Sequence, residues 1–208
     1  LLNIVKNRFG NSAVSLLLKM KDNGLHETKL TIDTSSELFM SGICHVLDVK
    51  NNKIFIKELQ SLVIKNNNYK QEIYSRYINK NRLTMLIAIV EKRLKIPLSQ
   101  CDVFNDFINT DKVFSSEVEL GFIASLISSY YNIEIPKNYI FVGEVDLAAN
   151  IRVSKKTSRE IEKTQIESSI RIYTSFEYNG TEANVIKLKN CLELKSILMD
   201  MKNEQEVS

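Results

Sequence analysis

Several common signatures are missing from this sequence of 208 residues, and each absence argues against a class of protein. No apolar run approaches the roughly 20 residues that a membrane-spanning helix needs, so no membrane association through such a helix is expected. No charged segment followed by an apolar stretch opens the chain, so no secretory signal peptide is predicted. The chain begins with Leu1 and not with Met, and we therefore expect a fragment or a processed piece.

Residues that bind metals or form disulfides are also scarce. The three cysteines, Cys44, Cys101 and Cys191, lie far apart, and no Cys-x-x-Cys pair is present. The two histidines, His26 and His45, are not spaced like zinc ligands. No metal site is predicted, and the cysteines are expected to be buried free thiols in a reducing cytoplasm.

The overall charge does not indicate a class of binding partner. The chain carries 28 basic and 25 acidic residues, a formal charge of +3. A balance this slight does not indicate nucleic-acid binding by itself, so such a function needs local clusters of cations. The apolar fraction of 44% is ordinary for a globular protein, and the length suffices for one core with or without an appendage.

The stretch 118–147 predicts the centre of the fold. Its first part places Val118, Phe122 and Leu126 in one row at helical spacing, which predicts a buried helix. The apolar run 139–142 is too short for an independent helix and predicts a central strand. A helix that leads into a buried strand through a short loop is one half of a layered α/β unit.

Other segments predict elements that surround this centre. We expect hairpins over 13–31 and 43–64, strands over 102–108, 170–175 and 185–188, and helices over 83–94, 154–168 and 192–201. The asparagine-rich stretch 65–79 lacks glycine and proline and is interpreted as a mobile loop. Together these elements predict an α+β fold in α/β layers, with a mixed sheet packed by helices.

Two segments carry clustered cations. The first, Lys6-Asn7-Arg8-Phe9-Gly10, is typical of a solvated turn, and its cations and glycine also suit a turn that contacts phosphate. The second is the charged helix 154–168 with the strand end before it, whose cations are Arg152, Lys155, Lys156, Arg159 and Lys163. Interspersed glutamates favour a solvated helix with ion pairs, and a surface for the DNA backbone is the alternative.

Three motifs resemble the bacterial RadA (Sms) family of DNA repair and recombination proteins. Residues 6–10 are identical to the family's KNRFG motif. The other two are similar to its N-R-L…E-K-R-L helix and its F-x-G-E-[IV]-x-L-x-x-x-I-R segment, and here they read Asn81-Arg82-Leu83 with Glu91-Lys92-Arg93-Leu94, and Phe141-Val142-Gly143-Glu144-Val145 with Leu147 and Ile151-Arg152. The motifs keep the family's order and approximate spacing. In one departure, Ala149 replaces a glycine.

The resemblance implies a domain layout. The family has an N-terminal zinc finger, a RecA-like ATPase core with KNRFG near its end, and a C-terminal Lon-protease-like domain. Residues 1–33 would then be the end of the ATPase core, left as a β-hairpin, 34–202 a proteolytically inactive Lon-like domain, and 203–208 a disordered tail. No G-x-x-x-x-G-K-[ST] motif occurs, so no ATP hydrolysis is expected from this chain alone.

The resemblance also implies where a Lon-type catalytic centre would stand. Active Lon-type proteases use a Ser-Lys dyad, in which the lysine activates the serine. Alignment through the helix places Glu117 at the serine position. The lysine of the family lies about fifteen residues after the glycine of the G-E-[IV] strand, which here falls at Ser158. A carboxylate cannot act as a serine nucleophile, so proteolysis is not expected. A peptidase that uses Ser116 with Lys155 or Lys156 is one alternative.

By this resemblance, the chain would be the C-terminal module of an ATP-driven motor for branch migration in recombinational DNA repair. Lys6 and Arg8 would contact nucleotide phosphate or DNA. The implied partners are single-stranded or branched DNA, further copies in a hexameric ring and a recombinase filament. ATP, Mg and Zn would serve the full-length, ATP-hydrolysing protein, and no cofactor is expected in this chain. A purely structural oligomerisation domain is the second alternative.

Overall fold

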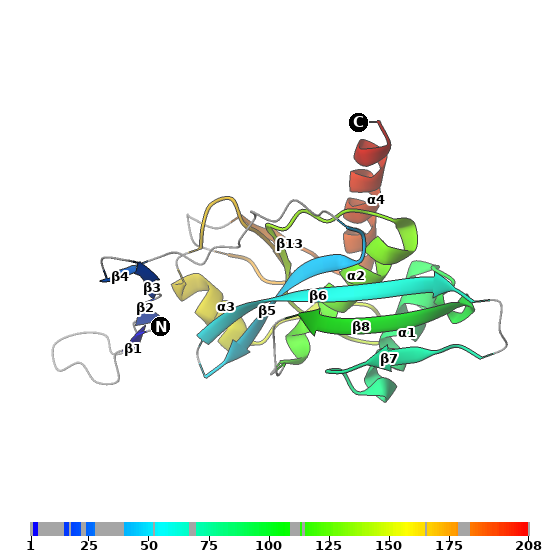
Figure 1. Cartoon of the computed structure of the whole chain (residues 1–208), viewed down its shortest axis with the longest axis horizontal. Helices are drawn as coiled ribbons and strands as arrows, with labels where there is room; N and C mark the ends of the chain where they lie inside the picture. Colours follow the sequence, from blue (N-terminus) through cyan, green and yellow to red (C-terminus); the bar gives the residue numbers. More distant parts are fainter. Residues whose placement is uncertain are drawn as a thin grey trace.

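A computed structural model of the chain describes residues 2–3, 15–16, 18–21, 24–27, 40–51, 53–66, 70–108, 113, 115–164, 166–178 and 184–207. Its centre is a seven-stranded sheet with the strand order β13-β12-β9-β5-β6-β8-β7 (Figure 1). The strands are β5 (Ile43–Lys50), β6 (Lys53–Lys65), β7 (Ile73–Ser75), β8 (Cys101–Ile108), β9 (Tyr139–Phe141), β12 (Arg171–Thr174) and β13 (Asn184–Lys187).

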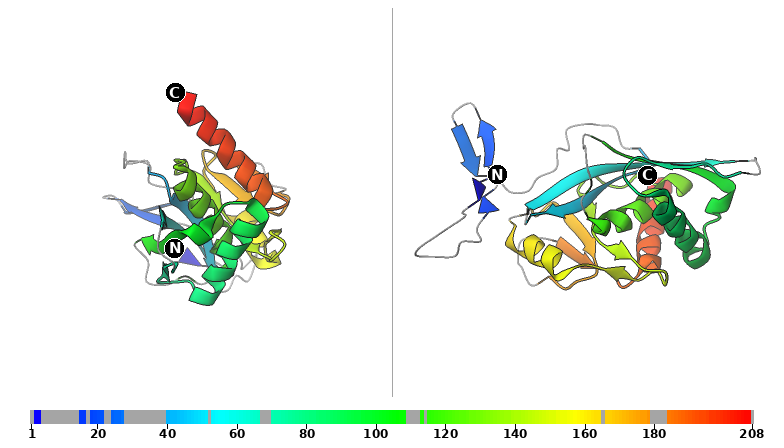
Figure 2. Two further views of the ribbon diagram at one scale, coloured as in Figure 1. Left: turned by 90° about the vertical axis from the view of Figure 1, so that its right-hand side faces the viewer. Right: turned by 90° about the horizontal axis from the view of Figure 1, so that it is seen from below.

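The described helices are α1 (Lys80–Leu94), α2 (Glu119–Tyr131), α3 (Lys155–Lys163) and α4 (Cys191–Val207), with the short 3-10 turns η1 (Leu98–Gln100) and η2 (Ser116–Val118). Small two-stranded sheets are formed by β1 (Leu2–Asn3) with β2 (Ser15–Leu16), by β3 (Leu18–Lys21) with β4 (Gly24–Glu27), and by β10 (Glu144–Val145) with β11 (Ile151–Arg152). The second view of Figure 2 shows the long β5–β6 ribbon along one side of the molecule and the helices on the other.

The sheet is mixed, as predicted. Strand β5 pairs antiparallel with β6, and β6 pairs antiparallel with β8. Strand β9 pairs parallel with both β5 and β12, and so it lies in the interior of the sheet. The predicted central strand and the predicted hairpin over 43–64 are therefore confirmed. The α+β fold in α/β layers is confirmed by the same sheet and the helices that pack on it.

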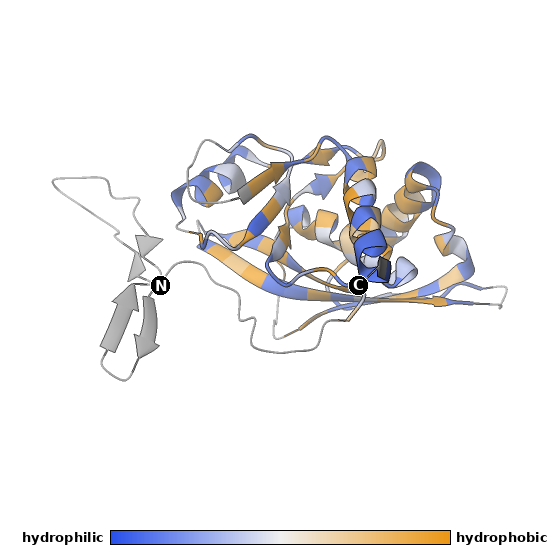
Figure 3. Cartoon of the chain, turned by 90° about the horizontal axis from the view of Figure 1, so that it is seen from above, coloured by the Kyte–Doolittle hydropathy of each residue, from blue (hydrophilic) through white to orange (hydrophobic). Residues whose placement is uncertain are grey.

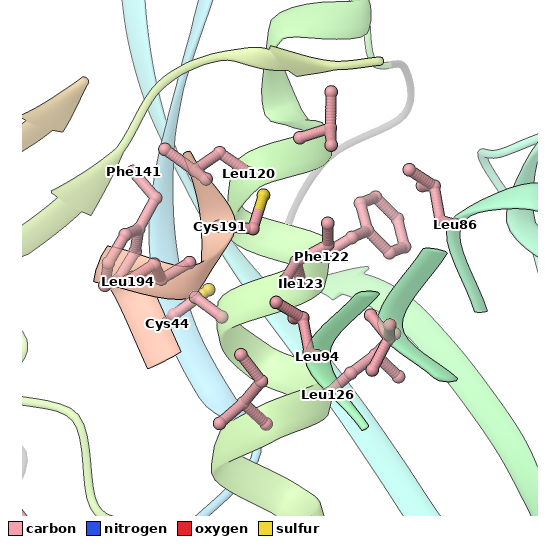
Figure 4. Close-up of a cluster of buried hydrophobic side chains, with 14 of the residues drawn as sticks. Cys44, Leu86, Leu94, Leu120, Phe122, Ile123, Leu126, Phe141, Cys191 and Leu194 are labelled. Atoms are coloured by element: carbon pink, nitrogen blue, oxygen red, sulfur yellow. The ribbon is translucent and has the colours of Figure 1, made fainter. Parts of the chain in front are cut away.

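Helix α2 is the most buried helix of the described chain, with residues 119–129 all buried. Most of its side chains are apolar, and its buried serines are hydrogen-bonded, as where Ser128 Oγ accepts from the Gly42 N–H at 2.7 Å. No face of the helix therefore needs solvent, and this explains its place between the sheet and the other helices. Gly121 permits the closest approach, because a Cβ added there would lie 2.0 Å from Cγ1 of Val46 on β5. Figure 4 shows the cluster around this helix, where Phe122 and Ile123 of α2 meet side chains from α1, α4 and the sheet.

Two hydrophobic clusters lie on opposite faces of β5 and β9. Val46 and Phe141 belong to the cluster with α1, α2 and α4, whereas their neighbours Leu47 and Ile140 belong to the cluster with α3. Successive residues of a strand point to opposite faces, so the alternation assigns each cluster to its side. Ile161 of α3 packs in the second cluster, and the rest of that helix is mostly hydrophilic (Figure 3).

The structure corrects the prediction of a mobile loop over 65–79 in the part that it describes, residues 65–66 and 70–79. This stretch contains strand β7, which pairs parallel with β8. The Val103 N–H donates to the Glu72 carbonyl at 2.9 Å, and the Glu72 N–H donates to Asp102 at 2.8 Å. These bonds join residues that are distant in the sequence, so local composition does not reveal them.

Two helix boundaries also differ from the predictions. Helix α3 ends at Lys163 and not at 168, because Thr164 adopts an extended conformation and Ile166 is buried in the core. Helix α4 continues to Val207, through residues 203–207 that were expected to form a disordered tail. Gln205 explains this extension, because its side chain exchanges two hydrogen bonds with the backbone of Glu134, at 3.1 and 2.7 Å.

Candidate nucleic-acid interface at helix α3

The predicted phosphate-contacting motif, Lys6, Asn7, Arg8, Phe9 and Gly10, lies outside the described residues. Its role therefore stays a prediction. The hairpin predicted over 13–31 is confirmed in its described part by the antiparallel pairing of β3 with β4. The other predicted site residues all belong to η2, β11 and α3, which the structure brings together.

Glu117 in η2 forms the closest link between η2 and α3. Its side chain is buried, and its Oε1 accepts a hydrogen bond from the Ser154 N–H at 2.5 Å. Its Oε2 accepts from the hydroxyl of Thr157 and from Ser115 Oγ, the latter at 3.3 Å. Both carboxylate oxygens are thus occupied by donors. The position that the resemblance assigns to a catalytic serine holds a carboxylate that binds the start of a helix.

A hollow of about 380 Å³ opens at this place. It is lined by Val49, Ser115, Ser116, Glu117, Glu144, Arg152, Val153, Ser154, Lys156 and Thr157. Ser116 and Lys156, which the peptidase alternative would pair, both line it, yet no hydrogen bond joins Ser116 to Lys155 or Lys156, all three of which are described. A dyad poised for acyl transfer needs that bond or a near approach to it, so the geometry gives no support to a peptidase.

Ser158, the residue predicted at the lysine position of the dyad, does not face Glu117. Its hydroxyl donates within α3 to the Lys155 carbonyl at 3.2 Å. The residue of α3 that meets Glu117 is the preceding one, Thr157, which is 2% exposed. Thr157 has no side-chain chemistry that could activate a nucleophile, and it acts here as a hydrogen-bond donor.

The predicted cations fall into two groups. Lys155, Lys156 and Arg159 are exposed on α3, and within the described part of the chain none of them forms an ion pair. The other two are paired: Arg152 lies 3.0 Å from Asp146, and Lys163 lies 3.6 Å from Glu160. We call Lys155, Lys156 and Arg159 the α3 basic face. It is the part of the predicted patch whose positive charge is not neutralised by a described neighbour.

The turn before β11 is organised by Asp146. Its Oδ1 accepts from the backbone N–H groups of Ala148 and Asn150, both at 2.9 Å, and its Oδ2 accepts from Arg152. The hydrogen bond from the Asn150 backbone is the main reason why the pKa of Asp146 is lowered to about 2, with the bonds from Asn150's side chain and Arg152 adding to it. Ala149 completes the turn at φ 68°, the left-handed conformation that a glycine adopts without strain.

Sequence reasoning missed a second buried carboxylate next to Glu117. Glu119 receives two hydrogen bonds from Arg82, Nε to Oε1 and Nη2 to Oε2, both at 2.6 Å. It also accepts from the Val145 N–H at 2.9 Å, while Arg82 donates to the Val145 carbonyl at 2.7 Å. Arg82 is the arginine of the N-R-L motif, and this motif was the only feature of the sequence that could have drawn attention to the contact between Arg82 and Glu119. In the structure, Arg82 joins α1 to α2 through Glu119 and to β10 through Val145.

Among the described residues, no group of three or more His, Cys, Asp or Glu side chains is arranged to hold a metal ion. The three cysteines are free and buried, as predicted, and burial raises the pKa of the Cys191 thiol to about 12. In the described part of the chain, no helix combines the length and the apolar character needed to cross a membrane.

Comparison with known proteins finds relatives that all carry the same name, DNA repair protein RadA. The chain is 34% identical over 153 residues to the DNA repair protein RadA of Helicobacter pylori (strain ATCC 700392 / 26695), a match that covers 73% of this chain and 34% of that protein. It is 33% identical over 157 residues to the DNA repair protein RadA of Campylobacter jejuni, covering 73% and 34%, and 32% identical over 155 residues to that of Chlamydia muridarum, covering 71% and 33%.

No protein-family model matches the chain. The matched region spans about one third of the length of these curated relatives.

Proposed function

The chain belongs to the RadA family of DNA repair proteins, of which it represents a C-terminal region, and we propose that it engages DNA through the α3 basic face. In this proposal the chain is the C-terminal module of an ATP-driven motor. The complete motor would form a hexameric ring and promote branch migration of recombination intermediates. The Walker motifs that bind ATP and Mg, and the finger that binds Zn, would belong to parts of the protein other than this chain.

The observation that carries the proposal is the place of two lysines in α3. Lys155 and Lys156 form the start of this helix, whose first turn contains no acidic residue. The N-terminus of a helix carries a partial positive charge, so cations there are unfavourable by roughly 0.3–1 kcal/mol each. Stability alone favours acidic residues at these positions. A surface that binds phosphate would explain why lysines stand there instead.

The surroundings of the α3 basic face support the same conclusion. Lys155, Lys156 and Arg159 are exposed and form no ion pair in the described structure, so their charges are available to a polyanion. Phosphate contacts by Lys and Arg supply most of the non-specific affinity of proteins for DNA. Three exposed cations on one helix suit the phosphate backbone of single-stranded or branched DNA, and they do not imply that any base is recognised.

Charge reversal tests the proposal. In the Lys155→Glu, Lys156→Glu double variant, binding of a fluorescent single-stranded oligonucleotide should weaken at least ten-fold. The slope of log affinity against log salt should become shallower by about 1.4, because two phosphate contacts on a single strand are lost. The matched control reverses Lys80 and Lys92, two exposed lysines of α1, one of them also at a helix start.

Equal affinities in wild type and the Lys155, Lys156 variant would show that α3 does not engage DNA. Equal losses in both double variants would show a general charge effect and would also reject the surface. If the wild-type chain binds no DNA and forms oligomers, the chain is a structural oligomerisation domain.

A second part of the proposal concerns Lys6 and Arg8. In the ring, these cations would reach the nucleotide phosphates of a neighbouring subunit or the DNA through charge-assisted hydrogen bonds. In the complete protein, Lys6→Ala or Arg8→Ala should therefore reduce DNA-stimulated ATP hydrolysis without changing thermal stability. Wild-type turnover and wild-type DNA binding in both variants would reject this role.

A further inference from the structure

The first turn of α3 lacks the acidic residue that often secures a helix start. In a capping box, a Ser or Thr before the helix accepts a hydrogen bond from the N–H three residues later, and a Glu or Gln at that later position bonds back to the first N–H. Ser154 makes the first of these bonds, accepting from the Thr157 N–H at 3.2 Å. Thr157 stands where the acid would be, so the return bond is missing from α3 itself.

Glu117 supplies that return bond from another element. Its Oε1 accepts from the Ser154 N–H at 2.5 Å, which is the group that a glutamate in place of Thr157 would bind. Its Oε2 accepts from the Thr157 hydroxyl and so fixes the third residue of the helix as well. Glu117 is only 6% exposed, and hydrogen bonds to an ionised acceptor are strong where water is excluded.

The charge of Glu117 matters for the same turn. A carboxylate near a helix N-terminus is favourable, whereas Lys155 and Lys156 there are not. A helix of nine residues gains little stability from its own backbone bonds, and α3 buries only Thr157 and Ile161. The first turn of α3, which carries the two lysines, therefore depends on a contact made outside the helix.

We propose that Glu117 is a positioning residue for the α3 basic face, acting as a capping acid supplied by η2. This inference rests on the proposed contact between α3 and DNA. It goes beyond that contact, because it gives a role to the carboxylate at the expected serine position. Loss of Glu117 should release the first turn, so that Lys155 and Lys156 lose their fixed orientation while their charges remain.

The test compares three variants of the full 208-residue chain. Glu117→Ala should weaken binding of a fluorescent single-stranded oligonucleotide about five-fold, the factor expected when a helix cap is lost. Exchange of the backbone amides in 154–158 should accelerate in the same variant. Glu119→Ala is the matched control. It removes a buried carboxylate two residues further along the chain, and this carboxylate contacts α1 and β10 but not α3. The control should reduce stability and leave DNA affinity within about two-fold of wild type.

The third variant exchanges the two partners. In Glu117→Thr with Thr157→Glu, the acid returns to the third position of α3 and can form an ordinary capping box with Ser154. DNA affinity and amide protection should recover to within about two-fold of wild type. A purely structural role of Glu117 predicts lower stability in Glu117→Ala with the DNA affinity of the folded protein unchanged. If Glu117→Ala does not fold, the exchanged variant decides alone: restored binding supports the proposal, and a folded protein that has lost binding overturns it.

Failure of this inference is distinguishable from failure of the proposed function. Unchanged affinity in Glu117→Ala, together with a loss in the Lys155, Lys156 variant, rejects the positioning role and leaves the DNA surface in place. Unchanged affinity in the lysine variant rejects the surface itself and, with it, this inference.

Discussion

Arg82 and Glu119 are joined at two points, with Nε to Oε1 and Nη2 to Oε2 both at 2.6 Å. The Glu119 side chain is 4% exposed and that of Arg82 is 29% exposed, so the pair lies at the edge of the core. The planar guanidinium fits both oxygens of the carboxylate, and the Glu119 hydrogen bond raises the pKa of Arg82 further. This pair fixes the start of α1 against the start of α2.

Arg82→Ala should therefore destabilise the chain strongly. The change leaves Glu119 buried with only the Val145 N–H as a donor, and an unpaired buried charge costs about 3 kcal/mol. Arg82→Lys keeps the charge but loses the two-point geometry, and we expect about half that loss. Urea unfolding measures both. Arg93→Ala, which removes a single exposed hydrogen bond of 3.2 Å to Leu147, is the control and should cost less than about 0.5 kcal/mol. Equal effects at the two arginines would contradict this account.

Helix α1 shows how much of the fold could be predicted. Its apolar spacing and Pro97 predicted a helix over 83–94, and it spans Lys80–Leu94. The earlier start follows from Asn79, whose side chain accepts from the Asn81 N–H at 2.8 Å. Strand β7 could not be predicted, because three residues carry no periodicity and their partner β8 lies about one helix further along the chain.

The candidate site was only partly predictable. The α3 cations follow from composition, and the pair of Lys163 with Glu160 is a local i,i+3 pair of the kind that the sequence predicts. The pair of Arg152 with Asp146 depends on the turn between β10 and β11, which the sequence did not reveal. The bonds from Glu117 cross to Ser154 and Thr157, at separations of 37 and 40 residues. No local pattern encodes such a contact. The missing acid in the Ser154–Thr157 turn shows that α3 itself offers the Ser154 N–H no acceptor, but it does not indicate which residue supplies one.

Lys95→Gly should stabilise the chain. Lys95 ends α1 with φ 58° and ψ 43°, a left-handed conformation that costs a residue with a side chain about 1 kcal/mol. Glycine adopts it freely, and the side chain of Lys95 is exposed. We expect a gain of about 0.5–1 kcal/mol in the free energy of unfolding. Lys92→Gly is the matched control, because the same change inside the last turn of α1 should cost about 1 kcal/mol. A loss of stability at both positions would contradict the argument.

Acid should weaken the turn at Asp146. Its pKa is about 2 in the folded chain, below the value of about 3.9 for an unfolded aspartate. A carboxyl whose pKa is lowered by folding contributes stability above the unfolded value, and this contribution is lost as the pH falls toward the folded value. The stability difference between wild type and Asp146→Asn should therefore be constant above about pH 5 and narrow between pH 4 and 2. Chemical unfolding across this range measures it, and a difference that does not vary with pH would assign the effect to another group.

Gly121→Ala tests the contact between α2 and the sheet. The new Cβ would meet Cγ1 of Val46 at 2.0 Å, far inside van der Waals contact, so α2 or β5 must shift. Overpacking of this kind costs about 1–3 kcal/mol, which should exceed the gain of up to about 1 kcal/mol in helix propensity. Val46→Ala removes the atom that collides. The double variant should therefore lose less stability than the two single variants lose together, by about 1–2 kcal/mol. Urea unfolding of the wild type, both single variants and the double variant measures this coupling. Strictly additive losses would mean that α2 adjusts elsewhere, and that Gly121 does not set its distance from β5.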